Sequence, residues 1–353
     1  MVAIELSPAH PSLQHVELSA VETETIISGH EGVIFYHWGR SRAWSTGVGR
    51  YAYPPRTSFS IRRFPSDQTG VTSTGFGHIT VGYIASNFVS PSTTTYLQTL
   101  LRNDTSDYLA GVATWADSIR YTKWGRFTSD FHFIDAKDSP PQYCGVDFDR
   151  DCKKDRGCVV SALHNYTTRL LDTDLRASER AIAAKFIIHF IGDIHQPLHT
   201  ENVERGGNGI HVLFDGRNYN LHHVWDTSIA EKLVGGVRRR GPYPEAKRWA
   251  DDLTHEINEG KYASESIEWV RSANLSDPIA TAMSWARIGN AYVCTHVLPE
   301  GPDAIRGQEL GSDYYEAAAP IIEVQVARAG FRLAAWLDLI VTSLKTQEAP
   351  GDL

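Results

Sequence analysis

The sequence has no long apolar run and little positive charge. Its 353 residues include 34 Lys and Arg against 42 Asp and Glu, a formal net charge of −8 at pH 7. No stretch approaches the roughly 20 apolar residues of a membrane-spanning helix, so nothing indicates an integral membrane protein. An acidic chain is poorly suited to binding nucleic acid through many Lys and Arg contacts to phosphate. Chemistry on nucleic acid would need a local source of positive charge, such as bound metal ions.

Cysteine is also scarce, and no CxxC zinc pattern occurs. The four cysteines are Cys144, Cys152, Cys158 and Cys294. An even number suits two disulfides in an oxidising compartment, and four reduced buried thiols are the alternative. Three N-x-[ST] sequons, which also favour secretion, lie at Asn103, Asn165 and Asn274.

The first 72 residues differ from the rest of the chain. They contain six acidic residues and six Arg but no Lys and no Cys, and their longest strongly apolar stretch, residues 33–36, is too short for a signal peptide. We interpret residues 1–72 as an atypical extension, either disordered or the product of a mis-assigned gene start; a small accessory domain is the alternative. The main domain would then span residues 73–345, followed by a tail at 346–353.

The periodicity of the main domain predicts a mainly α-helical fold. Apolar residues recur at helical spacing over 78–88, over 178–195 with Ser178 as the N-terminal cap, and from Pro320 to about residue 344. The segment 178–195 is apolar nearly all round, so we expect it to be buried. The GGNG turn and the alternation of apolar and polar residues between 206 and 220 predict one short β-hairpin.

The buried helix carries two polar residues four positions apart, His189 and Asp193, which share one helix face. His222 and Asp226 repeat this spacing, and His199 lies between the two pairs. A single His–Asp pair is often a core histidine satisfied by a carboxylate. Two such pairs close in sequence favour a zinc site, because imidazole and carboxylate are ligands that Zn²⁺ accepts.

Two further histidines, His195 and His223, lie next to these pairs but off the shared faces. We expect both to support the ligands rather than to bind metal themselves.

Several spaced motifs closely resemble the fungal single-strand-specific nucleases, the S-one/P-one nuclease family. They are FIGDIHQPLH at 190–199, GGNG at 206–209, NLHHVWD at 220–226, ATWAD at 113–117 and HFID at 132–135. The resemblance extends from about Gly77 to about Ile340. It implies a mainly α-helical fold of the phospholipase C type, with three zinc ions in a cleft.

The resemblance also implies ligand sets. One zinc would be held by Asp117, His132, His189 and Asp193, and a second by His199, His222 and Asp226. The third would use His78 and Asp193 together with the amino group and carbonyl of an N-terminal Trp. Here Ser73 stands at the position of that Trp, so we expect two zincs to bind well and the third poorly or not at all.

Other roles follow from the same resemblance. Arg120 would stabilise the transition state, beside the catalytic carboxylates Asp117 and Asp193. Phe133 would stack on a nucleobase and Asp135 would hydrogen-bond it, with Asn208 near that pocket. For Phe133 and Arg120 the alternatives are core packing and an ordinary surface position. The implied disulfides are Cys144–Cys294 and Cys152–Cys158.

The expected activity is zinc-dependent endonucleolytic cleavage of single-stranded DNA and RNA to 5′-phosphate products, together with 3′-nucleotidase activity. Attack by metal-activated hydroxide is the expected chemistry. A secreted monomer is expected. The alternatives are a zinc-binding relative with impaired catalysis, and a zinc phospholipase C, a family that has Glu where this chain has Asp226.

Overall fold

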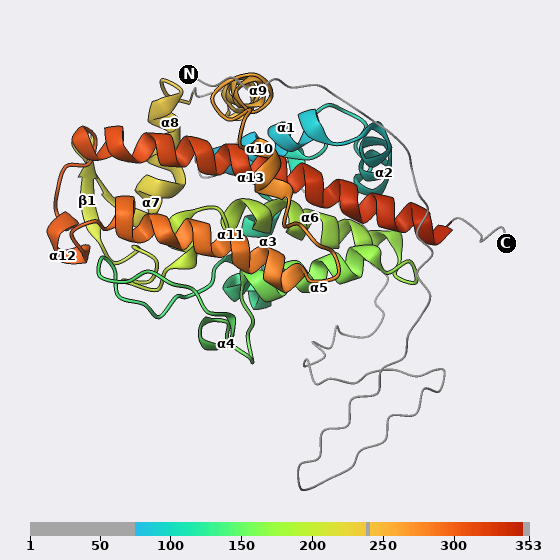
Figure 1. The fold of residues 1–353 in the computed structure, drawn as a ribbon, viewed down its shortest axis with the longest axis horizontal. Coiled ribbons are helices and arrows are strands. Elements are labelled where there is room, and N and C mark those ends of the chain that lie inside the picture. The colour runs from blue at the N-terminus through green and yellow to red at the C-terminus, as the bar shows by residue number, and fades with distance from the viewer. Residues whose placement is uncertain (1–74, 238–240, 349–353) are drawn as a thin grey trace, which may run out of the picture. The chain divides into compact units, whose positions relative to one another are not determined.

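The computed structural model describes residues 75–237 and 241–348. Within these ranges the fold is mainly α-helical, as predicted, and its one sheet is a two-stranded hairpin (Figure 1). The longer helices are α1 (Phe76–Phe88), α2 (Pro91–Leu101), α5 (Val159–Leu171), α6 (Ala177–Asp193), α9 (Tyr243–Asn258), α11 (Pro278–Tyr292) and α13 (Asp313–Glu348). The shorter helices are α3 (Trp115–Ile119), α4 (Phe148–Asp151), α7 (Leu221–His223), α8 (Ile229–Leu233), α10 (Ser266–Val270) and α12 (Pro302–Ile305).

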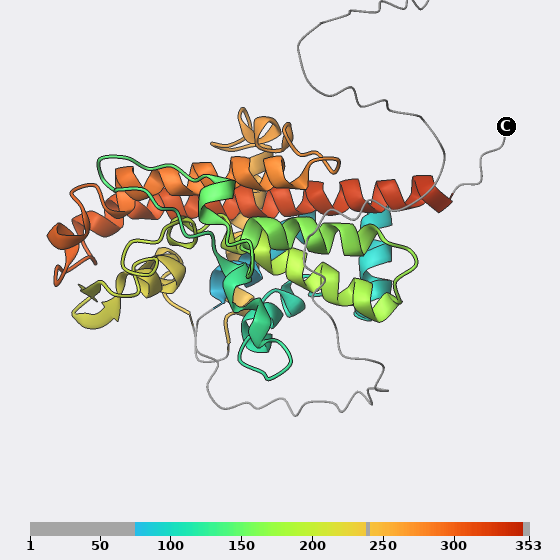
Figure 2. The ribbon, with the colours of Figure 1, turned by 90° about the horizontal axis from the view of Figure 1, so that it is seen from below.

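Two groups of buried apolar side chains form the core. One lies among α5, α6, α11 and α13 and includes Phe186, Trp285 and Trp336. The other includes Phe76 and Trp249, whose rings stack between α1 and α9 with centroids 5.5 Å apart. In Figures 1 and 2, α13 (red) runs alongside α11 (orange) and the green helices α5 and α6. His189 and Asp193 of α6 are therefore held in place by helix packing at the centre of the domain.

Helix α6 confirms the predicted buried helix but differs at both ends. It begins at Ala177, after Arg176, and no side chain caps it, so the predicted cap at Ser178 is wrong. The helix ends at Asp193, two residues earlier than predicted, because the chain turns before Pro197. Its C-terminal half is buried from Ala183 onward, apart from Lys185 and Gly192.

The last helix is longer than predicted. Helix α13 begins at Asp313, and Pro320 lies inside it rather than in its first turn. A proline inside a helix removes one backbone hydrogen bond, and packing of α13 against α1 and α6 compensates for that loss. The helix continues to Glu348, three residues into the predicted tail; residues 349–353 and the predicted extension 1–72 lie outside the described residues. None of the described helices, α13 included, has the length and apolar character needed to cross a membrane.

The predicted hairpin is present as β1 (His211–Phe214) paired antiparallel with β2 (Arg217–Asn220). Its turn is Asp215–Gly216, where φ is +49° and +73°, the left-handed conformation that two-residue hairpin turns require. The GGNG segment precedes the hairpin. Helix α7 follows β2 at once, so the hairpin delivers His222 to its position.

Two disulfides, Cys144–Cys294 and Cys152–Cys158, brace the loops beside α4 and α11. This is the pairing that the resemblance implies. The first joins the loop before α4 to the π-helical turn Val293–Val297, and the second closes a short loop before α5. Disulfides are typical of proteins from oxidising compartments.

Candidate metal centre

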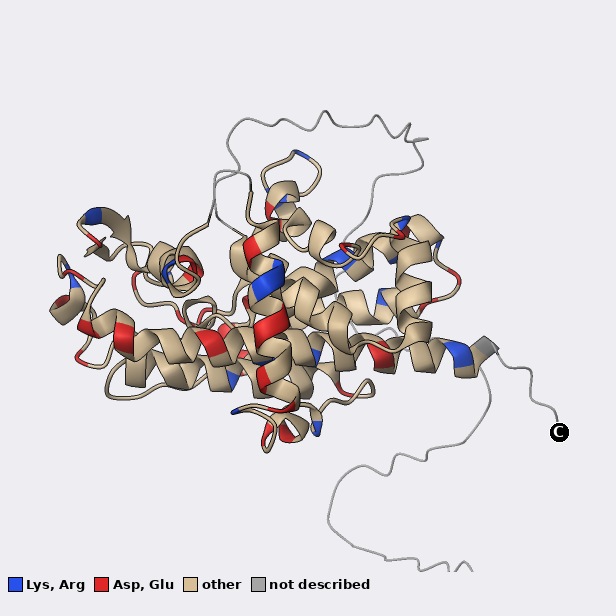
Figure 3. Ribbon diagram, turned by 90° about the horizontal axis from the view of Figure 1, so that it is seen from above, with Lys and Arg blue, Asp and Glu red and all other residues tan. Residues whose placement is uncertain are grey.

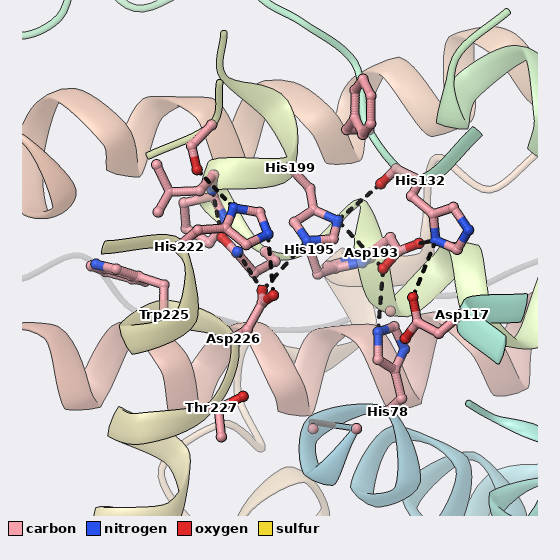
Figure 4. A pocket seen from close by; sticks show the side chains of 18 of the residues that line it. His78, Asp117, His132, Asp193, His195, His199, His222, Trp225, Asp226 and Thr227 are labelled. Atoms are coloured by element: carbon pink, nitrogen blue, oxygen red, sulfur yellow. Dashed lines mark hydrogen bonds and ion pairs between the residues drawn. The ribbon is translucent and has the colours of Figure 1, made fainter. Parts of the chain in front are cut away.

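A cavity of about 1170 Å³ lies where α1, α3, α6 and the segment after α6 meet. Seven of the eight predicted ligand residues line it, and the eighth, His189, is buried directly beneath. Figure 4 shows the side chains of the seven lining ligands turned toward one another from separate elements. The lining ligands are His78, Asp117, His132, Asp193, His199, His222 and Asp226.

Four residues whose donor atoms meet at the C-terminal end of α6 form the first group, which we call the α6 group: Asp117, His132, His189 and Asp193. Asp193 Oδ2 lies 2.9 Å from His132 Nδ1 and 3.1 Å from His189 Nε2. Asp117 Oδ1 lies 3.8 Å and 3.7 Å from the same two nitrogens. Ligands about 2.0–2.1 Å from a tetrahedral zinc are separated by roughly 3.3 Å. The spacing of the α6 group therefore matches one such ion.

The backbone fixes the ring of His189. Its Nδ1–H donates to the carbonyl of Ala113 at 2.7 Å, so Nε2 is the nitrogen that faces Asp193. The contact joins α6 to the turn before α3, the helix that carries Asp117. Orientation of a ligand histidine by a carbonyl is typical of metal sites.

The second group, the hairpin group, consists of His199, His222 and Asp226. His222 Nε2 lies 3.1 Å from Asp226 Oδ2, and His199 Nε2 lies 3.4 Å from Asp226 Oδ1. Both rings donate from Nδ1 to carbonyls: His199 to His132 at 2.9 Å and His222 to Gly206 at 2.7 Å. Gly206 has a φ of +61° and a Cβ there would meet the backbone, so the GGNG turn requires glycine at this position.

A third possible site has two donor residues, His78 and Asp193. His78 Nε2 lies 3.2 Å from Asp193 Oδ1, the oxygen that faces away from the α6 group. The ring of His78 stacks on that of His189 with centroids 4.0 Å apart. Gly192 leaves room for this stacking, because a Cβ on it would lie 2.5 Å from His78 Nδ1. The position of the expected Trp, Ser73, lies outside the described residues.

Charge keeps the central carboxylates ionised. Burial would raise the pKa of Asp193, yet the imidazoles of His189 and His132 hold it well below its usual range. In the same way, His222 and His199 outweigh burial and hold the pKa of Asp226 well below its usual range. Ionised carboxylates are ready ligands for a cation.

The pKa values of three ligand histidines, His132, His189 and His199, shift in different directions. Burial lowers the pKa of His132 to about 4. For His189 burial also acts downward, but Asp193 and Asp117 outweigh it and raise the pKa to about 9. The pKa of His199 is likewise raised to about 9 against the effect of burial, by Asp193 and Asp226. A bound metal would replace these protons, because imidazole binds metal through a free lone pair.

The donor atoms fit zinc in type and in number. Three His/Asp clusters have all their donor atoms within 4.8 Å of one another. Within the described residues, His199 Nε2 is buried and makes no hydrogen bond, although Asp226 Oδ1 lies 3.4 Å away. A buried nitrogen that makes no hydrogen bond is costly unless it binds something. A cation between His199, His222 and Asp226 would satisfy it.

The other predicted site residues also line the cavity. Arg120 Nη2 lies 3.4 Å from Asp117 Oδ1, so its guanidinium faces the α6 group. Phe133 is half-buried at the wall. Asp135 is paired with Lys153, with Oδ2 and Nζ 2.8 Å apart. Asn208 is exposed at the edge of the cavity, and its side chain donates to the carbonyl of Arg205.

The two remaining histidines lie off the metal groups. His195 Nδ1–H donates to the carbonyl of Ile191, and its Nε2 accepts from Arg332 Nη1 at 2.8 Å. His223 stacks on Tyr219 with ring centroids 4.6 Å apart.

The three sequon asparagines lie at the surface, Asn165 and Asn274 exposed and Asn103 half-buried.

The sequence analysis missed two cavity residues. Gln196 Nε2 donates to Asp226 Oδ1 at 2.6 Å and so orients a ligand of the hairpin group. Its position between Asp193 and His199 was the available signal. Tyr121 is 80% exposed and lines the same cavity. Its neighbour Arg120 was the only hint in the sequence.

Comparison with known proteins agrees with this geometry. A family model described as S1/P1 Nuclease matches residues 74–342, which contain both metal groups. The chain belongs to the S1/P1 nuclease family. Nuclease S1 of Aspergillus oryzae is 49% identical over 266 residues, 75% of this chain and 91% of that protein. Nuclease P1 of Penicillium citrinum is 44% identical over 264 residues, 75% of this chain and 96% of that protein.

Relatives of the family also occur in plants. Endonuclease 4 of Arabidopsis thaliana is 31% identical over 277 residues, 76% of this chain and 88% of that protein. Each of these S1/P1 nuclease relatives is covered over most of its own length, so the likeness concerns the whole domain rather than one motif.

Proposed function

We propose that this member of the S1/P1 nuclease family is a zinc-dependent endonuclease of single-stranded DNA and RNA that leaves 5′-phosphates and also removes 3′-phosphates from nucleotides. Its membership makes it a hydrolase of nucleic acid phosphodiester bonds. The observation that carries the zinc assignment is the convergence of the α6 group and the hairpin group on one cavity. The 3′-nucleotidase activity is part of the proposal because the family resemblance implies it.

Zinc would be held by Asp117, His132, His189 and Asp193 in one site and by His199, His222 and Asp226 in the other. When bound, the zinc ions would supply positive charge to phosphoryl oxygens and make a water molecule acidic enough to attack phosphorus near neutral pH. Asp193 Oδ2 faces His132 and His189 and Oδ1 faces His78, so this carboxylate would serve both the α6 site and the third site. The carbonyl partners of His189, His199 and His222 occupy Nδ1 of each ring, so Nε2 would be the nitrogen that binds metal.

Arg120 would bind the phosphate directly. Its Nη2 is near Asp117 and its guanidinium lines the cavity, where it can form charge-assisted hydrogen bonds to phosphoryl oxygens. These bonds would strengthen as negative charge grows on those oxygens in the transition state. Phe133 would stack on a base beside the scissile bond. A stacked base of this kind must be unpaired, which favours single strands over duplex.

The third zinc site is the weakest of the three. Among the described residues His78 and Asp193 offer two donor atoms, which alone make a weak site. We expect two tightly bound zincs per chain. The two disulfides support a secreted protein, and we propose a monomer.

The test is an assay of the purified protein on four substrates: a single-stranded 30-mer, the same sequence as duplex, a 3′-mononucleotide and phosphatidylcholine vesicles. We expect rapid cleavage of the single strand, slow cleavage of the duplex, phosphate release from the mononucleotide and no lipid hydrolysis. Elemental analysis of the same sample gives the zinc count. Lipid hydrolysis would favour a phospholipase C, and bound zinc without phosphodiester cleavage would favour an impaired relative.

A further inference from the structure

Two short segments beside the cavity carry an excess of positive charge in an acidic protein. Residues 120–132 and 152–158 together contain six Lys and Arg and two Asp, whereas the whole chain has 34 basic and 42 acidic residues. In Figure 3 the two signs are interspersed over the described helices. Four of the six cations are exposed, and we call them the cationic rim: Lys123, Arg126, Lys154 and Arg156.

Contacts between the two segments hold the rim beside the metal centre. Arg156 Nη1 lies 3.2 Å from Asp130 Oδ2, in the 3-10 helix Arg126–His132 that ends at a predicted zinc ligand. At the other end of the disulfide loop, Lys153 Nζ lies 2.8 Å from Asp135 Oδ2. The disulfide Cys152–Cys158 closes this loop. The disulfide loop that carries Lys154 and Arg156 is therefore anchored beside the cavity, which Lys153 of the same loop lines.

An exposed aromatic ring completes the arrangement. Tyr121 is 80% exposed, although most large apolar side chains in the described residues are buried. Arg120 Nη2 donates to its hydroxyl at 3.2 Å, and the guanidinium carbon lies 5.1 Å from the ring centroid. Tyr121 and Lys153 line the same cavity, Tyr121 beside Arg120 and Lys153 beside Asp135. An exposed ring next to cations is the combination that binds single strands without sequence preference.

We propose that the cationic rim and Tyr121 form a strand-holding subsite for single-stranded nucleic acid outside the metal centre. The rim binds phosphates of the strand beyond the bond that is cut, and Tyr121 stacks on one of its bases. The inference rests on the proposed function, and it adds that the enzyme prefers long strands to short ones. The local cations also explain how a chain of net charge −8 holds a polyanion.

The experiment compares kcat/KM on a single-stranded 30-mer with kcat/KM on a dinucleoside monophosphate, which has one phosphodiester and no strand beyond it. The variant is Arg126→Ala with Lys154→Ala. The matched control is Arg287→Ala with Lys345→Ala, two exposed cations on α11 and α13 rather than on the two rim segments. In the rim variant, kcat/KM on the 30-mer divided by kcat/KM on the dinucleoside monophosphate falls about tenfold. The slope of log kcat/KM on the 30-mer against log salt concentration becomes shallower by about 1.4, or about 0.7 for each lost phosphate contact.

Tyr121 is tested separately. Tyr121→Ala lowers kcat/KM on the 30-mer about fivefold or more through lost stacking, whereas Tyr121→Phe keeps the ring and the rate. Equal ratios in the rim variant and its control would overturn the inference while leaving the proposed function intact. An equal loss on both substrates would also overturn it, because that is damage to the metal centre. If the wild-type protein cut neither substrate, the proposed function would itself be wrong.

Discussion

The α6 group and the hairpin group use the same ligand types but are built from different structure. In the α6 group the side chains of His132, His189 and Asp193 are 0–1% exposed, and two of them belong to one buried helix; the fourth member, Asp117 of α3, is 35% exposed. In the hairpin group His199, His222 and Asp226 are 11%, 21% and 36% exposed and follow short turns.

This difference in burial suggests different roles for the two groups: one holds its metal rigidly, and the other leaves room for substrate. Core packing holds the α6 group, so its ligands keep their spacing whether or not metal is present. Hydrogen bonds to carbonyls and to Gln196 hold the hairpin group. With three protein ligands and greater exposure, the hairpin group leaves a coordination position for substrate or water. We therefore expect the α6 group to bind its zinc more tightly.

Asp193→Asn should have the largest effect, because it removes the charge that the α6 group shares with His78. Asp193 oxygens lie within 3.3 Å of nitrogens of His78, His132, His189 and His199. We expect hydrolysis of single-stranded DNA to fall at least about 1000-fold and the zinc count to fall. Retention of most of the activity would contradict the assignment.

The control for this change is Asp338→Asn. Asp338 accepts hydrogen bonds from Ser90, which caps α2, and lines no part of the cavity. The control is expected to lower thermal stability and to leave the zinc count unchanged.

Asp226→Asn should affect the hairpin group alone. Asn keeps one oxygen that can bind metal, so we expect about a 100-fold loss of activity that excess zinc partly restores. Zinc analysis should show one ion lost and one retained. If the variant lost both ions, the two groups would not be separable.

Gln196→Ala tests how the hairpin group is oriented. Without the hydrogen bond to Asp226 Oδ1, zinc affinity at this group should fall by about 10- to 100-fold, the usual effect of removing a partner of a metal ligand. Competition with a chelator measures it. Gln98→Ala, which removes an exposed contact to the Asp104 carbonyl, is the control. A chelator curve equal to that of the control would refute the role of Gln196.

Gly192→Ala should have the smallest effect on activity but a specific one on stability. The new Cβ would meet His78, and crowding of this kind costs about 1–3 kcal/mol. In a chain that carries His78→Ala the penalty should disappear, because the clashing ring is gone. Denaturant unfolding of the two single variants and the double variant measures this coupling. If Gly192→Ala lowered the free energy of unfolding by the same amount with and without His78, the new Cβ would be clashing with a residue other than His78.

The sequence predicts the parts of the site that lie within one element. The i, i+4 pairs His189–Asp193 and His222–Asp226 follow from helical spacing, and the buried character of α6 follows from its composition. Helix ends were less predictable: Pro320 has the local chemistry of a first turn, but tertiary packing extends α13 to Asp313.

Contacts between distant segments could not be derived from spacing. Asp117 and His132 join the α6 group across more than 50 residues, and only the family resemblance placed them there. The pairing of Lys153 with Asp135 and the exposure of Tyr121 depend on how loops pack beside the cavity. Neither leaves a periodic signal, which is why the cationic rim emerged only from the structure.

The most direct test of a zinc centre at this cavity is cleavage of a single-stranded 30-mer by protein that has been stripped with a chelator and then titrated with zinc. The account predicts no cleavage without zinc, recovery as about two zincs bind per chain, and no recovery in Asp193→Asn. Full cleavage by protein that elemental analysis shows to be free of zinc would contradict it.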